Sequence, residues 1–184
     1  MNEYLFVLAG ANLLAYDKQT GDKLDWIDIS KRSGGNLSMA RLGGPKGQHL
    51  VASSKTSLCC WRIPQTLQEA HHTKVTLEYE VTLPSAIVSF QVGHTQVRFD
   101  SFLRRKTYLF FELQIVVLRR EGDHHFIKSY LEVYDIKTGT LVRTLVDGDQ
   151  AEFVVSYQLT EDSVLALLAP RKNRPLFLRV WKFY

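Results

Sequence analysis

The sequence predicts an all-β protein built from repeated antiparallel sheets, and two observations carry this prediction. One segment occurs twice: LLAYDKQTGDKLDWI begins at Leu13, and LEVYDIKTGTLVRTL begins at Leu131. Short apolar segments separated by turn residues, a pattern typical of strands, also run through most of the 184 residues. An internal repeat of this kind indicates that the chain is assembled from similar structural units.

The repeat has a period near 45 residues. Its pattern is Leu, any residue, a small or aliphatic residue, an aromatic residue, any residue, then Ile or Phe; LCCWRI and LRVWKF are two further copies, and LLAYDK is a partial one. The aromatic residues of the four copies are separated by 45, 73 and 47 residues; they are Tyr16, Trp61, Tyr134 and Trp181. Four short strands with their turns occupy about 45 residues, so each repeat predicts one four-stranded propeller blade, the third with an insertion of about 26 residues.

Each repeat divides into expected strands. The first repeat has three, at Tyr4–Leu8, Asn12–Asp17 and Lys23–Ile29. The second has four, at Leu37–Leu42, Gln48–Ser53, Leu58–Ile63 and Val75–Leu83. The third has four, at Ile87–Val92, Thr107–Leu118, Ser129–Ile136 and Thr140–Val146. The last has three, at Glu152–Leu159, Ser163–Ala169 and Pro175–Phe183. We therefore expect a partial β-propeller of about three and a half to four four-stranded antiparallel blades, with blades at about residues 1–30, 36–84, 86–148 and 151–184.

The repeated Tyr-Asp-x-x-Thr-Gly sequence predicts a tight turn after the third strand of a blade. Asp17 and Asp135 are expected to cap the turn with their carboxylates. Gly21 and Gly139 are expected to adopt the positive φ that a residue with a Cβ resists. Both copies would then be the same hairpin of two blades.

The aromatic-Asp pair at the end of the third strand resembles the pattern of the WD-repeat family of β-propellers, and this chain looks like a divergent member. Tyr16-Asp17 and Tyr134-Asp135 match the pair, whereas Trp61-Arg62 and Trp181-Lys182 keep only the aromatic residue. The acidic residue that this family places six positions before the aromatic is absent from all four repeats; the positions hold Gly10, Lys55, Lys128 and Pro175. We therefore do not expect the hydrogen-bonded tetrad of that family.

An open half-ring would leave apolar blade faces in water, because stacked repeats derive stability from their neighbours. The chain is therefore expected to be the N-terminal half of a propeller. The remaining blades would come from the same longer chain or from a second chain.

Composition favours an intracellular location, in the nucleus or the cytoplasm. The only cysteines, Cys59 and Cys60, are adjacent and unsuited to a disulfide, which fits a reducing compartment. No apolar segment reaches the length of about 20 residues that crosses a bilayer, so we expect no membrane span. The apolar segment from Tyr4 to Ala15 resembles an export signal but lacks a preceding basic region, and the strand interpretation explains it better. The formal net charge of +4 permits an acidic partner without requiring one.

No motif indicates catalysis, a cofactor or a metal. The pairs His71-His72 and His124-His125 have the side chains of metal ligands, but no Cys or carboxylate stands at ligand spacing, so solvated loops are expected. Cys59 and Cys60 lie on opposite faces of one strand and are expected to act as small buried apolar residues. Sequence signatures of hydrolases, nucleotide-binding loops and metalloproteases are absent, so we expect no enzyme.

Basic residues around the third-repeat insertion and in the last repeat are the candidate partner-binding set: Arg104, Arg105, Lys106, Arg119, Arg120, Arg171, Lys172 and Arg174. Aromatic residues are interleaved with the basic residues of the insertion, and a segment of this composition can bind phosphates and stacked bases. The other interpretation is a long hairpin with aromatic residues in the blade interface and solvated arginines at its ends.

The sequence thus predicts a non-catalytic protein–protein interaction scaffold, a subunit of an intracellular multiprotein assembly. An alternative is a propeller that contacts RNA or DNA in a ribonucleoprotein or ribosome-assembly complex. A further alternative, from the family resemblance, is the substrate-adaptor propeller of a ubiquitin ligase.

Overall fold

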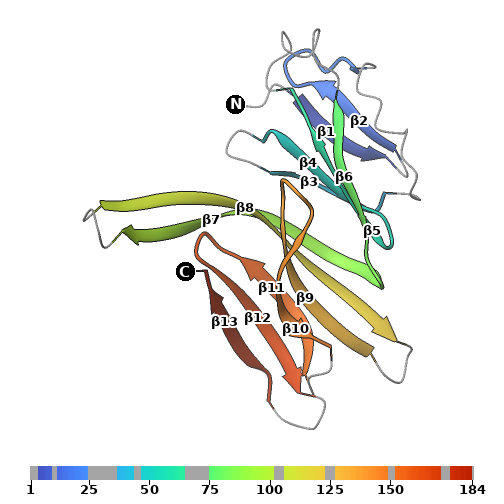
Figure 1. The fold of residues 1–184 in the computed structure, drawn as a ribbon. Coiled ribbons are helices and arrows are strands. Elements are labelled where there is room, and N and C mark those ends of the chain that lie inside the picture. The colour runs from blue at the N-terminus through green and yellow to red at the C-terminus, as the bar shows by residue number, and fades with distance from the viewer. Residues whose placement is uncertain are drawn as a thin grey trace. The chain divides into compact units, whose positions relative to one another are not determined.

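The fold is all-β, as the sequence predicts. The computed structural model describes residues 4–9, 12–24, 37–43, 47–64, 75–101, 106–122, 127–148, 152–170 and 175–183. Among these residues the regular elements are all strands, arranged in four antiparallel sheets (Figure 1). The described part of the chain contains no helix long and apolar enough to span a membrane. The chain divides into two compact units, Met1–Ile87 and Val88–Tyr184.

The first unit contains a two-stranded and a four-stranded sheet. The two-stranded sheet pairs β1 (Tyr4–Ala9) with β2 (Asn12–Asp17). The four-stranded sheet runs in chain order through β3 (Met39–Gly43), β4 (His49–Ser53), β5 (Ser57–Arg62) and β6 (Thr76–Thr82). Each of these strands begins and ends within two residues of its predicted bounds. Of the predicted strand Lys23–Ile29, Lys23 forms a bridge to Tyr16, and residues 25–29 lie outside the described residues.

The second unit contains a four-stranded and a three-stranded sheet, again in chain order. The four-stranded sheet comprises β7 (Ala86–Ser101), β8 (Lys106–Gly122), β9 (Ile127–Asp135) and β10 (Leu141–Asp147). The three-stranded sheet comprises β11 (Glu152–Leu159), β12 (Ser163–Pro170) and β13 (Phe177–Lys182). Strands β7 and β8 have 16 and 17 residues and exceed their predicted lengths (Figure 1). The insertion therefore lengthens one hairpin, because alternating apolar residues such as Val97 and Phe99 continue the strand pattern.

The four aromatic residues of the repeat occupy corresponding positions. Each is the last residue but one of its strand, in β2, β5, β9 and β13. Each also pairs with the preceding strand of its sheet; the pairs are Tyr16 with Leu5, Trp61 with Leu50, Tyr134 with Ile115, and Trp181 with Val164. The sequence repeat is therefore a repeat of backbone register.

In each unit the two sheets share one apolar core. The core of the first unit joins Ala15 of β2 to Leu50 and Trp61 of the four-stranded sheet, with Phe6 of β1 packed against them. The core of the second unit joins strands β8, β9 and β10 to β11 and β12; its members are Val116, Leu118, Leu131, Val133, Leu145, Val146, Val154, Val164, Ala166 and Leu168. Because full burial of one such side chain stabilises the fold by about 1.5–3 kcal/mol, these shared cores hold the paired sheets together.

Candidate functional site

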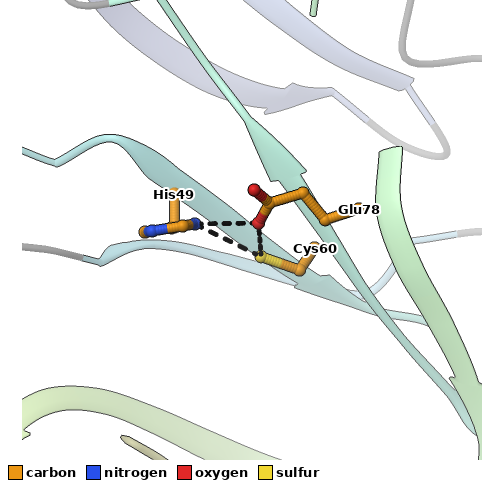
Figure 2. A group of neighbouring side chains, drawn as sticks. All are labelled: His49, Cys60 and Glu78. Atoms are coloured by element: carbon orange, nitrogen blue, oxygen red, sulfur yellow. Dashed lines mark hydrogen bonds and ion pairs between the residues drawn. The ribbon is translucent and has the colours of Figure 1, made fainter. Parts of the chain in front are cut away.

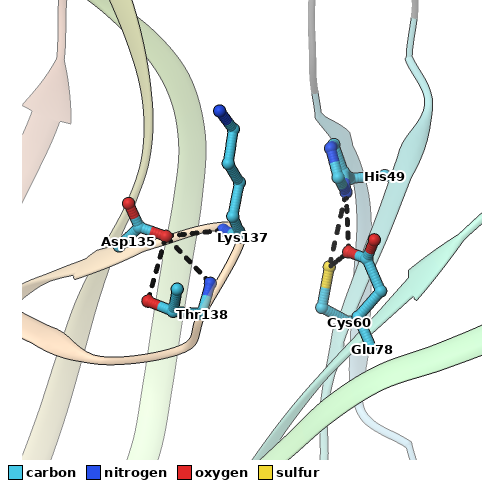
Figure 3. A network of polar contacts seen from close by, with 6 residues as sticks. All are labelled: His49, Cys60, Glu78, Asp135, Lys137 and Thr138. Atoms are coloured by element: carbon cyan, nitrogen blue, oxygen red, sulfur yellow. Dashed lines mark hydrogen bonds and ion pairs between the residues drawn. The ribbon is translucent and has the colours of Figure 1, made fainter.

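The two Tyr-Asp-x-x-Thr-Gly segments form the same turn, as predicted. An Oδ1 atom of Asp17 accepts backbone N–H groups two and three residues later at 2.6 and 3.0 Å, and Asp135 does so at 2.7 and 2.8 Å (Figure 3). Gly21 and Gly139 follow with φ of 78° and 69°, and each donates its N–H to the aspartate carbonyl at 2.9 Å. The two carboxylates therefore cap the turns and stabilise them.

Part of the predicted partner-binding set lies within the described residues. Five lie outside the described residues: Arg104, Arg105, Arg171, Lys172 and Arg174. Lys106 begins strand β8, and its side chain is not described. The histidine pairs His71-His72 and His124-His125 also lie outside the described residues. Their proposed roles, and the expectation that the histidines are solvated, stay predictions.

Arg119 belongs to a buried polar cluster inside the second unit. Its Nε and Nη2 atoms donate to the two oxygens of Glu132 at 2.8 and 2.7 Å, and the Tyr134 hydroxyl donates to the same carboxylate at 2.7 Å. The guanidinium carbon lies 3.8 Å from the ring centroid of Tyr130. Burial alone would lower the pKa of Arg119, but the hydrogen bonds and charge of Glu132 outweigh it and raise that pKa. Burial, followed by the hydrogen bond to Glu132, raises the pKa of Tyr134.

Arg120 links the two sheets of the second unit. Its Nη2 atom donates to the carbonyl oxygen of Val154 on β11 at 3.2 Å, and its guanidinium carbon lies 4.4 Å from the ring centroid of Phe153. Arg119 and Arg120 thus both make contacts within the unit. A role for them in partner binding stays a prediction.

A second polar cluster, in the first unit, brings together His49, Cys60 and Glu78 from β4, β5 and β6 (Figure 2). The Nδ1 atom of His49 lies 3.0 Å from Oε2 of Glu78, and Sγ of Cys60 lies 3.9 Å from that Nδ1 and 3.8 Å from that Oε2. His49 and Cys60 are buried, whereas Glu78 reaches the surface. A carboxylate only accepts, so the N–H of His49 donates to Glu78.

A β-bulge explains why these three side chains meet. Along the β5–β6 ladder, Cys60 pairs with Tyr79 and Trp61 pairs with Leu77, so Glu78 is an extra residue without a partner on β5. A bulge of this kind redirects one side chain and often lies next to a functional site. Here it brings the Glu78 carboxylate onto the face of β5 that carries Cys60.

The Cys60 thiol is held in its protonated form. Burial, and to a lesser degree the charge of Glu78, raise its pKa from 9.0 to about 12, although a hydrogen bond with Tyr79 acts in the opposite direction. An uncompensated thiolate is therefore disfavoured there, and a positive charge next to it would reverse that preference.

Sequence reasoning missed this cluster because it compared the two neighbouring cysteines with each other. They are both buried, and Cys59 belongs to the apolar core of the first unit. Cys60 is on the opposite face, as predicted, but its neighbours there are residues 11 positions before it and 18 positions after it. The available signal was the pairing of His49 with the end of β5, which requires the strand register and the bulge to be known.

No protein-family model matches the chain, and no curated protein is significantly similar to it.

Proposed function

We propose that the chain is a non-catalytic scaffold of the β-propeller type, which docks a further β-sheet of its assembly through an apolar face of its last sheet. The observation that carries this proposal is the repeated direction of packing. In the two-stranded sheet, Ala15 belongs to the core shared with the next sheet, on the face opposite to Tyr16. In the sheet β7–β10, Val133 does the same on the face opposite to Tyr134.

In the second sheet of each unit, the aromatic residue itself faces the shared core. Trp61 lies in the core shared with the preceding sheet, and Trp181 packs against the core of the second unit. Within each unit, the second sheet thus turns its aromatic residue toward the first sheet, and the first sheet turns its opposite face toward the second. This is the arrangement expected of successive propeller blades.

The last sheet has an apolar face that a further sheet would cover if the same packing pattern continued. It is the face of β12 and β13 opposite to Trp181, and we call it the far face; it comprises the cross-strand pairs Leu165–Val180 and Leu167–Leu178. Leu178 is 60% exposed and Val180 is 47% exposed, which is unusual for neighbouring aliphatic residues on one sheet face. A further blade, from the same longer chain or from a second chain, would cover the far face.

Cross-linking of the protein purified from its own cells, as the full gene product, tests this proposal. Lys182 is exposed on β13 and supplies a reactive amine close to the far face. We expect cross-links from Lys182 to one recurrent β-sheet segment and their loss in the Leu178→Glu variant, because a buried carboxylate would oppose sheet packing.

Val142→Glu is the matched control, since Val142 is 55% exposed on β10 and lies outside the far face. It should keep the cross-links of Lys182. If both variants behave alike, or if Lys182 forms no reproducible cross-link, the scaffold assignment is wrong.

A further inference from the structure

We propose that His49, Cys60 and Glu78 form a binding site for one zinc ion, independent of the proposed scaffold function. The three side chains come from three adjacent strands of one sheet, and their ligand atoms all lie within 4.8 Å of one another (Figure 2). Nitrogen, sulfur and carboxylate oxygen are the three ligand types that proteins use for zinc.

The spacing of the ligand atoms matches the edges of a zinc tetrahedron. Ordinary zinc–ligand bond lengths at tetrahedral angles place nitrogen and oxygen about 3.3 Å apart, and sulfur about 3.6 Å from either. The corresponding distances are 3.0, 3.9 and 3.8 Å. Shifts of about 0.3 Å, within the range of ordinary side-chain adjustment, would bring all three atoms to bonding distance of one ion.

Charge balance favours a divalent ion at this place. The Cys60 thiol loses its proton to water when it binds zinc, and the thiolate and the Glu78 carboxylate together neutralise the two positive charges. His49 contributes a neutral nitrogen if its proton resides on Nε2. The loaded site would carry no net charge, which suits two ligands that are buried in the sheet.

The ligand set also selects among metals. A thiolate and an imidazole disfavour magnesium and calcium, which require oxygen ligands. Three protein ligands leave the fourth zinc position for a water molecule, on the side where Glu78 reaches the surface. The ion would join the outer strand β6 to β5 and β4 and hold the bulge in place.

Cobalt binding provides a direct test, because Co²⁺ adopts zinc geometry and a thiolate ligand gives an intense charge-transfer absorption. The whole chain, stripped with a chelator, would be titrated with Co²⁺ and then with Zn²⁺. We expect one equivalent to bind with the charge-transfer band, Zn²⁺ to displace it, and Mg²⁺ to leave it unchanged. Zn²⁺ should also raise the unfolding temperature, because it binds only the folded sheet.

Two pairs of variants separate this site from other histidines and carboxylates. Cys60→Ala should abolish the band, whereas Cys59→Ala, which changes the neighbouring cysteine in the apolar core, should retain it. Glu78→Gln should weaken binding at least about tenfold. Glu80→Gln, a change of the same kind on the same strand, should not. Because Glu78 reaches the surface, its variant remains informative even if Cys60→Ala fails to fold.

Three results would overturn the assignment. They are the absence of a stoichiometric band, equal loss of the band in the Cys59 and Cys60 variants, and equal affinities of the Glu78 and Glu80 variants. None of these outcomes bears on the cross-links of Lys182, so the two proposals fail separately.

Discussion

The two units of the chain share a turn and differ in the polar cluster that each contains. The turns capped by Asp17 and Asp135 share two hydrogen bonds from backbone N–H groups to the carboxylate and a positive-φ glycine. In the second unit, both oxygens of Glu132 accept hydrogen bonds from charged or hydroxyl donors. In the first unit, the side chains of His49, Cys60 and Glu78 offer three ligand atoms to one point. One unit thus contains a carboxylate paired with a cation, and the other brings together three side chains of the types that ligate metals.

The two clusters differ in the hydrogen-bond donors that surround the carboxylate. Arg119 supplies only N–H donors, so together with the Tyr134 hydroxyl it brings three hydrogen bonds and a compensating positive charge to the Glu132 carboxylate. The first cluster has no comparable cation among its three members, and its thiol and imidazole can both act as acceptors. All three groups of the second unit's cluster are buried, whereas the first unit's cluster has two buried groups and one carboxylate that reaches the surface.

The largest expected effect comes from breaking the buried ion pair of Arg119 and Glu132. Glu132→Ala would remove the carboxylate that compensates the charge of Arg119 at a buried place, since the two side chains are only 9% and 6% exposed. We expect a loss of about 3–5 kcal/mol in the free energy of unfolding. Urea denaturation monitored by circular dichroism measures it.

Two comparisons sharpen that result. Glu78→Ala should cost only about 1 kcal/mol without metal, since its side chain is 23% exposed and reaches water. Replacing both members of the buried pair, Arg119→Met with Glu132→Leu, should recover most of the loss. Equal losses for Glu132→Ala and Glu78→Ala would mean that the two clusters do not differ as described.

An intermediate effect concerns alkaline pH. The pKa of Tyr134 is higher in the folded protein than in the unfolded chain, so its contribution is complete below about pH 10 and is lost as the pH rises further. The slope has an upper limit of about 1.4 kcal/mol per pH unit for this one group. Urea midpoints measured from about pH 9 to about pH 11 should fall less steeply for Tyr134→Phe than for the unchanged protein. Parallel curves would show that Tyr134 ionises freely in the folded sheet.

The smallest effect is expected in the feature that the units share. At these exposed turns Asp17→Ala removes two hydrogen bonds from backbone N–H groups, and Asp135→Ala removes the same two and one from the Thr138 hydroxyl; each variant should cost about 1 kcal/mol. Differential scanning calorimetry of the two variants should give matching losses. A cost at one position several times that at the other would indicate that the repeated sequence does not have an equivalent role in the two units.

The strands were predictable because their signal is local. Alternating apolar residues and the Tyr-Asp-x-x-Thr-Gly turn are read within a few positions, and Glu152–Leu159 begins and ends as predicted. The length of β7 and β8 was underestimated, since a two-stranded extension has a weaker apolar pattern than a strand buried in a sheet.

The polar clusters were not predictable from the same patterns. Arg119 was read as a candidate partner-binding residue, and its pairing with Glu132 depends on the β8–β9 register. Cys60 and His49 lie on separate strands, and their approach to Glu78 depends on one unpaired residue in β6. Contacts of this kind are set by register, and a shift of one residue would send each side chain to the other face.

Because Glu78 has no partner on β5, the ion site that we propose depends on the length of β6. Removing that single residue would let Leu77 and Tyr79 follow each other in a regular ladder with β5. The strand would persist, but no carboxylate would lie next to the Cys60 sulfur. A lineage could thus gain or lose the ion site that we propose through one codon insertion or deletion, with the surrounding sheet left intact.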